Sequence, residues 1–151
     1  MKKSIDIIVY GDGSCKNEKN KHTDMGCGFV AYKRNYVIEA QAIHPGKGTS
    51  NLSEWEALIS SVRFIVPYIL ERHPNDRVKL QYFADSQIIV RMVTGEYSHR
   101  NFTPEYNRVK FWLDQLKPNH RFSATWIPRA ENEVADRLSK LGNPYFKGRV
   151  K

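Results

Sequence analysis

Several features of membrane or secreted proteins are missing from this sequence of 151 residues. No apolar run approaches the ~20 residues of a membrane span, and Asp6 interrupts the region where a signal peptide would need an unbroken apolar core. Cysteine is scarce, and Cys15 and Cys27 support neither a disulfide framework nor a CxxC zinc site. We therefore expect a cytoplasmic protein with reduced thiols and no membrane contact.

Internal repeats, low-complexity tracts and long linkers rich in glycine, serine or proline are also missing. A chain of this length can bury a substantial core as one domain. We assign residues 1–142 to this domain and residues 143–151 to a basic C-terminal tail that has no readable periodicity.

Acidic residues are outnumbered by basic ones. The chain has 16 Asp and Glu and 24 Lys and Arg, which gives a formal net charge of +8. An excess of this sign suits a polyanionic partner, with nucleic acid ahead of an anionic membrane. Solubility alone would also explain it. The basic residues are dispersed, with no polybasic block to mark a lipid surface.

Hydrophobic periodicity predicts an α/β fold with the element order βββαβααβα. The expected strands are 5–10, 26–32, 36–42, 77–84 and 122–127, and the expected helices are 53–67, 86–94, 103–116 and 131–141. Residues 11–23 and 44–48 are expected to be loops. The first three strands form an antiparallel meander, and the whole chain forms one five-stranded mixed sheet flanked by helices.

Three local details follow from the helix patterns. Ser53 with Glu56 would make a capping box at the start of the first helix, although a start near Ser50 is also open. Pro67 is expected to end or kink that helix. In the last helix, the apolar residues Val134, Leu138 and Leu141 are expected to face inward.

Chain direction brings four acidic residues to one edge of this sheet. Asp12 follows the first strand and Asp85 the fourth, and these strands run parallel if the crossover is right-handed. Glu54 lies in the first turn of a helix that begins at the same edge, and Asp136 in the second turn of the last helix. Open α/β sheets bind their ligands at such an edge.

Four carboxylates in one pocket cannot all stay ionised without a counter-charge. One pair at 4 Å repels by roughly 4 kcal/mol at an effective dielectric of 20. Oxygen ligands without nearby Cys or His favour Mg²⁺ or Mn²⁺ over zinc, and two such ions can activate a water and stabilise the leaving oxygen of a phosphodiester. Each acid alone would be read as an ordinary surface residue, and their joint placement favours a metal-dependent nuclease.

Four segments of the sequence also match a known family in order and spacing, at residues 12–15, 49–57, 84–87 and 126–136. Through them the chain resembles type I ribonuclease H, in particular its short-loop archaeal and reverse-transcriptase-like branch. The resemblance covers nearly the whole chain. It implies an endonuclease that cleaves the RNA strand of RNA–DNA hybrids with two Mg²⁺, for which Mn²⁺ could substitute, and it assigns metal binding and catalysis to Asp12, Glu54, Asp85 and Asp136.

The resemblance also implies substrate contacts. Asn51 and Gln87 would lie in the minor groove, and Lys47 and Thr49 near a DNA phosphate. The backbone near Gly13 and Ser14, with Glu54, would face RNA 2′-hydroxyls. Solvation of Lys47 and helix capping by Asn51 are equally open. The full set of implied contacts is Gly13, Ser14, Lys47, Thr49, Ser50, Asn51, Gln87, Arg129 and Asn132.

The sequence departs from the family at three places. Many members carry a catalytic His in a loop before the last helix, and here Arg129 is the nearest candidate, either for phosphate binding and product release or for a salt bridge. Ser50 replaces a common asparagine, and the basic protrusion of some members is missing.

We expect a monomer with no obligatory protein partner. The alternatives are a nuclease of the same fold that cuts a DNA junction or double-stranded RNA, and a non-catalytic hybrid-binding domain.

Overall fold

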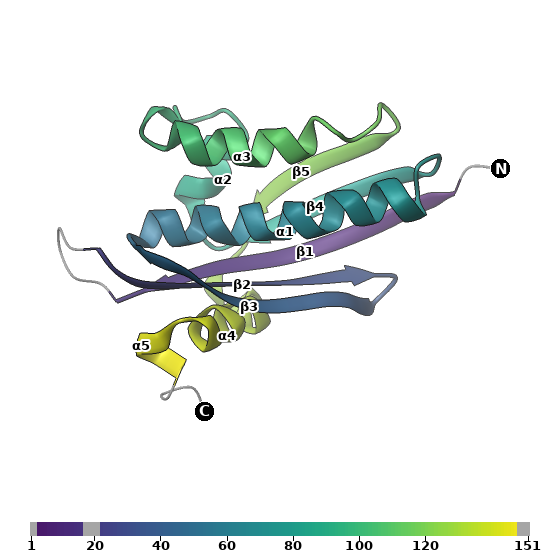
Figure 1. The fold of residues 1–151 in the computed structure, drawn as a ribbon. Helices are drawn as coiled ribbons and strands as arrows, with labels where there is room; N and C mark the ends of the chain where they lie inside the picture. The colour runs from purple at the N-terminus through teal and green to yellow at the C-terminus, as the bar shows by residue number, and fades with distance from the viewer. Residues whose placement is uncertain (1–2, 17–21, 148–151) are drawn as a thin grey trace.

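The computed structural model describes residues 3–16 and 22–147 and contains one five-stranded sheet in the order β3-β2-β1-β4-β5 (Figure 1). β1 pairs antiparallel with β2 and parallel with β4, and β4 pairs parallel with β5. The strands are β1 (Ser4–Cys15), β2 (Thr23–Lys33), β3 (Tyr36–Gly48), β4 (Arg77–Ala84) and β5 (His120–Trp126). The predicted fold class, the meander and the parallel crossover are therefore confirmed.

Helices cover the two faces of the sheet unequally. The longer helices lie on one face and the C-terminal ones on the other (Figure 1). The helices are α1 (Ser50–Arg72), α2 (Gln87–Val93), α3 (Thr103–Leu113), α4 (Glu133–Gly142) and α5 (Pro144–Lys147), with 3₁₀ turns η1 (Arg100–Phe102) and η2 (Arg129–Glu131). None of the helices within the described ranges has the length and apolar character needed to span a membrane.

Two strands extend further than expected. β1 continues to Cys15 because its antiparallel pairing with β2 persists through Asp12, opposite Gly28, after its pairing with β4 has ended at Tyr10. Asp12 is thus inside a strand instead of after it. β3 continues to Gly48 through the predicted loop 44–48, and Pro45 is tolerated there because β3 is an edge strand.

The first helix also differs from its predicted limits. Thr49 is its N-cap, with a side chain that accepts a hydrogen bond from the Leu52 N–H at 3.3 Å, so the start near Ser50 is right and the Ser53 capping box is wrong. Glu56 pairs instead with Arg108 of α3 at 2.8 Å. The helix passes through the exposed Pro67 to Arg72, because buried residues on both sides hold it to the core.

The hydrophobic core lies between the sheet and helices α1–α3. Trp55 of α1 has no exposed surface and packs with alternate residues of the central strands, such as Ile7 and Leu80. Val109 of α3 is buried as well, and Trp112 packs against the core. Cys27 is buried and Cys15 half-buried, and both thiols are free.

Helix α4 presents small residues to the sheet. Ala135 and Ser139 are its buried residues, whereas Val134 is 51% and Leu141 39% exposed, so the predicted inward face of this helix was wrong for those two. The reason lies in β2, where a Cβ on Gly28 would come within 2.5 Å of the Leu138 Cβ. The helix backbone approaches the strand too closely for large side chains between them.

Residues after Gly142 are not the featureless tail that was expected. Asn143 is fully buried, and α5 (Pro144–Lys147) packs against β2. Residues 148–151 of the predicted tail lie outside the described part of the chain.

Candidate active site

Three of the predicted carboxylates form a compact group. Asp12, Glu54 and Asp85 each offer a carboxylate oxygen, and these oxygens lie within 4.8 Å of one another. Asp12 comes from β1, Glu54 from the first turns of α1, and Asp85 directly follows β4. The group therefore lies at the sheet edge that chain direction predicted.

A glycine lets α1 approach this edge. The Gly13 N–H donates to the Glu54 carboxylate, and a Cβ on Gly13 would lie 2.6 Å from the Glu54 backbone nitrogen. The absence of a side chain at position 13 is thus explained by helix packing. In the protein without substrate this N–H is bonded to Glu54, and the expected contact of the backbone here with an RNA 2′-hydroxyl stays a prediction.

Asp136 stands slightly apart from the compact group. Its N–H donates to the Asn132 carbonyl, which places it in the first turn of α4 and not in the second. Its carboxylate lies 3.2 Å from the Lys140 ammonium and 3.7 Å from the Arg129 guanidinium. Two cations thus offset its charge, and it lines the same cavity as the other three carboxylates.

Burial and mutual repulsion favour the protonated forms of the compact group. Burial, followed by the charges of Glu54 and Asp85, raises the pKa of Asp12 to about 10. Burial likewise raises the pKa of Glu54 to about 7 and raises that of Asp85. At neutral pH the group must hold protons or cations, and its all-oxygen donor set fits Mg²⁺ or Mn²⁺.

The carboxylates open into a cavity of about 400 Å³. Of the predicted substrate-binding residues, the cavity is lined by Gly13, Ser14, Ser50, Asn51 and Arg129. The side chain of Ser14 donates to the Ser139 carbonyl at 2.9 Å. Four lining residues were not singled out from the sequence: Cys15, Ser86, Lys140 and Phe146. Cys15 and Ser86 belong to two of the segments that match the family and Lys140 follows Asp136 at helical spacing, whereas Phe146 had no signal in the sequence.

The remaining predicted contacts lie outside the cavity lining. Lys47 is exposed on β3, Gln87 is exposed at the start of α2, and the Thr49 hydroxyl caps α1. Asn132 is 1% exposed and donates to the Gly11 carbonyl at 3.0 Å. Asn132 thus connects β1 with the start of α4, and its expected substrate contact stays a prediction.

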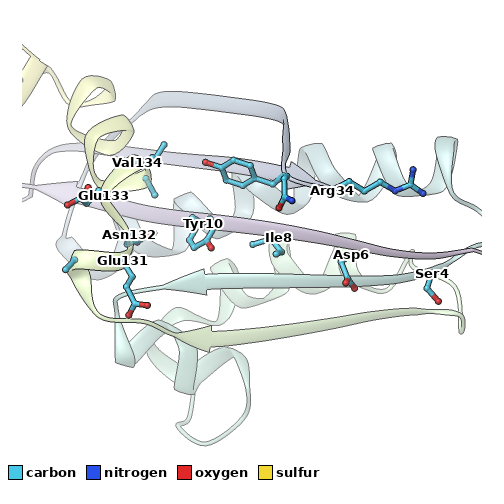
Figure 2. Close-up of a pocket in the computed structure, with 13 residues that line it drawn as sticks. Ser4, Asp6, Ile8, Tyr10, Arg34, Glu131, Asn132, Glu133 and Val134 are labelled. Carbon is cyan, nitrogen blue, oxygen red and sulfur yellow. The ribbon is translucent and has the colours of Figure 1, made fainter.

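A larger cavity of about 650 Å³ lies elsewhere, along the other half of β1 (Figure 2). Ser4, Asp6, Ile8 and Tyr10 form its floor, and residues 131–134 close one end. None of the four predicted carboxylates lines it. The smaller cavity is therefore the one that holds the four predicted carboxylates.

A five-stranded mixed sheet with these carboxylates at one edge defines the ribonuclease H-like class of α/β proteins. The family model described as RNase H matches residues 4–143, and the chain belongs to this family. Among curated proteins, the bifunctional protein Rv2228c of Mycobacterium tuberculosis is 23% identical over 142 residues, with 88% of this chain covered. The chain spans about a third of the length of the curated relatives it matches, 34% in each case.

Solved structures share the fold. RNase H1 from the halophilic archaeon Halobacterium salinarum is 21% identical, with a TM-score of 0.74 over 91% of this chain and 96% of that one. The N-terminal RNase H domain of Rv2228c is 20% identical, with a TM-score of 0.75 over 91% and 93%. LC11-RNase H1 in complex with an RNA/DNA hybrid is 22% identical, with a TM-score of 0.73 over 87% and 92%.

Proposed function

We propose that this protein is an endoribonuclease that hydrolyses the RNA strand of RNA–DNA hybrids with two Mg²⁺ ions. The observation that carries the proposal is the compact group of Asp12, Glu54 and Asp85, with Asp136 on the wall of the same cavity. Membership of the RNase H family supports the same activity. A purely binding domain would gain nothing from four acids beside the phosphates of its ligand.

The proposed roles divide between the carboxylates and their neighbours. Asp12, Glu54 and Asp85 would hold one divalent ion, and Asp136 would help to hold a second. When bound, such a pair activates the attacking water and stabilises the leaving oxygen of the phosphodiester. Arg129, which is 73% exposed, is free to contact a phosphate while it neutralises Asp136.

We place the hybrid across the cavity mouth. Ser50 and Asn51, at the start of α1, would face the minor groove of the hybrid. Gln87 at the start of α2 and Lys47 on β3 flank this mouth in the proposal, with Lys47 directed at a DNA phosphate. Binding of LC11-RNase H1 to an RNA/DNA hybrid supports the substrate class by analogy of fold.

The deciding experiment uses end-labelled hybrid, double-stranded RNA and double-stranded DNA, each with Mg²⁺, with Mn²⁺ or with EDTA. We expect internal cuts in the RNA strand of the hybrid, lost with EDTA and reduced at least 1,000-fold by Asp12→Asn, in line with the loss of electrostatic stabilisation at an active site. Asp6→Asn, on the same strand but outside the cavity, is the matched control and should cut normally.

Each alternative function gives a different result in this assay. Cleavage that persists in Asp12→Asn would remove the carboxylates from the mechanism. Preferential cutting of double-stranded RNA, or of a DNA junction added as a fourth substrate, would favour the second nuclease. Binding of the hybrid without any cleavage in either metal would favour the non-catalytic domain.

A further inference from the structure

The segment after α4 forms part of the active-site wall. Phe146 of α5 lines the 400 Å³ cavity together with Asp12, Gly13 and Asn51. Among the described residues that line this cavity it is the one aromatic side chain, and its ring lies outside the main hydrophobic core. The Phe146 ring therefore forms part of the cavity wall and not part of the core.

Asn143 holds this segment in place through a satisfied polar network. Its side-chain amide donates to the Asp24 carbonyl at 2.9 Å and to the Ser14 carbonyl and hydroxyl at 3.3 Å each. Its side-chain oxygen accepts from the Tyr145 N–H at 2.9 Å, and its backbone carbonyl accepts from the Phe146 N–H at 3.0 Å. A buried amide satisfied on all sides fixes the geometry around it, because any displacement leaves polar groups unpaired.

The network connects the segment to the strand that carries Asp12. Ser14, two residues after Asp12 on β1, is bonded both to Asn143 and, through its hydroxyl, to the Ser139 carbonyl of α4. Gly26 on β2 makes room for this contact, because a Cβ there would lie 2.6 Å from the Asn143 Cβ. The Tyr145 ring meets the Phe146 ring edge to face at 4.8 Å. The position of Phe146 is thus set by the same strand that positions the carboxylates.

An aromatic ring gains little from such a cavity in the free protein. The other side chains that line the cavity are small, polar or charged, so they offer the ring no apolar partner. A nucleotide supplies what the cavity lacks, since the apolar face of a sugar or base packs well on an aromatic ring. The bases of a hybrid are paired, which leaves the sugars exposed in the groove.

We infer that Phe146 is a substrate-contact residue whose ring packs against a sugar of the nucleotide strand bound at the carboxylates. The inference rests on the proposed function and deepens it, because it names one contact of the same site. It also moves the end of the catalytic domain from residue 142 to at least Phe146. The contact is sequence-independent, as every nucleotide carries a sugar.

Phe146→Ala tests the contact. Binding to a labelled hybrid is measured in the Asp12→Asn background to prevent cleavage, and steady-state cleavage is measured with Asp12 present. We expect about a tenfold rise in Kd and KM, the scale of losing one aromatic packing contact with a nucleotide, with kcat within about twofold. Phe146→Tyr retains the ring and should restore binding. Tyr36→Ala, which removes an aromatic ring that is 76% exposed on β3, is the matched control.

Two further measurements separate this contact from a structural role. The thermal midpoint and the Mn²⁺ affinity of Phe146→Ala should match those of the parent, and if that variant is unstable, Phe146→Leu keeps the bulk and tests the ring alone. A Kd within twofold of the parent in a folded variant that lacks the ring overturns the inference. If wild-type protein neither binds nor cuts hybrids, the proposed function fails first, whereas normal cleavage with an unaffected variant rejects the Phe146 contact alone.

Discussion

At the scale of single residues, the site is dominated by repulsion between buried carboxylates. Asp12 is 5% exposed, and burial together with Glu54 and Asp85 raises its pKa to about 10. A group with a raised pKa binds protons more tightly in the folded state than in the unfolded state. Stability from these protons is complete below the ordinary carboxyl pKa of about 4 and is lost as pH rises through the raised values. The metal-free protein should therefore lose stability toward alkaline pH.

Asp12→Asn should remove much of this loss, because an amide cannot ionise. In EDTA at pH 8 we expect the variant to be more stable than wild type by about 2–4 kcal/mol, because wild-type Asp12 must take up a proton on folding that the unfolded chain has released, whereas the amide needs none. For a chain of this size that is a rise of roughly 5–15 °C in the midpoint. Thermal melts from pH 5 to pH 9 measure the difference, which should shrink toward pH 5.

Mg²⁺ provides the complementary measurement. Metal ligands must be deprotonated to bind, so Mg²⁺ should raise the wild-type midpoint more at pH 8 than at pH 6 and should have little effect on Asp12→Asn. Asp6→Asn, at an acid outside the site, should behave as wild type at every pH. Equal pH profiles for wild type and Asp12→Asn would contradict the electrostatic account.

At the scale of elements, the placement of α4 decides whether the fourth carboxylate reaches the site. Asp136 is carried by this helix, which contacts β2 and β1 through Ala135 and Ser139. Gly28 permits the close approach, and Asn132 fixes the start of the helix through its bond to the Gly11 carbonyl. A change in this packing should therefore affect both stability and catalysis.

Gly28→Val tests this coupling. A side chain there would meet the Leu138 Cβ at 2.5 Å and the Ser139 nitrogen at 2.7 Å, and overpacking of this kind costs about 1–3 kcal/mol. We expect a lower urea midpoint together with reduced cleavage, because the helix that carries Asp136 is displaced. Ala40→Val adds similar bulk at an exposed position of β3 and should change neither quantity. A destabilised variant with normal cleavage would show that Asp136 does not depend on this packing.

At the scale of the whole molecule, positive charge predominates but the site itself is acidic. The chain carries a formal +8, although its active-site edge concentrates four acids. Arg129 at this edge and the basic residues elsewhere on the surface can contact a polyanionic backbone. Since the family's basic protrusion has no counterpart in the sequence, binding should depend on this dispersed field.

Hybrid affinity should therefore fall steeply with salt. Release of counterions from a nucleic acid gives a linear fall of log K with log salt, and for four to six phosphate contacts we expect a loss on the order of 100- to 1,000-fold between 50 and 200 mM. Titrations of the Asp12→Asn protein with a labelled hybrid at four salt concentrations measure the slope. Lys47→Ala, a single-charge variant, should lower the slope by about one contact, and a flat dependence would contradict the electrostatic binding mode.

The sequence by itself determined the element order, the sheet and the four acids at one edge. Strand and helix periodicities are local, and chain direction follows from them, so the positions of Asp12, Glu54 and Asp85 could be derived before any coordinates. The family resemblance, confirmed by the match over residues 4–143, rests on segments contiguous in sequence. Each of these properties can be read from a single segment and does not depend on contacts with distant parts of the chain.

Only the tertiary structure decided how closely the elements approach each other. The glycines at 13 and 28 make room for helices that arrive from distant parts of the chain, and the exposed Val134 reflects that close contact. The continuation of β1 through Asp12 depends on its pairing with β2. Asn143 and Phe146 gave no local pattern, because their roles arise from contacts with residues more than a hundred positions earlier. These features are set by side-chain volume and by hydrogen bonds between residues distant in sequence. Neither can be read from a short stretch of sequence.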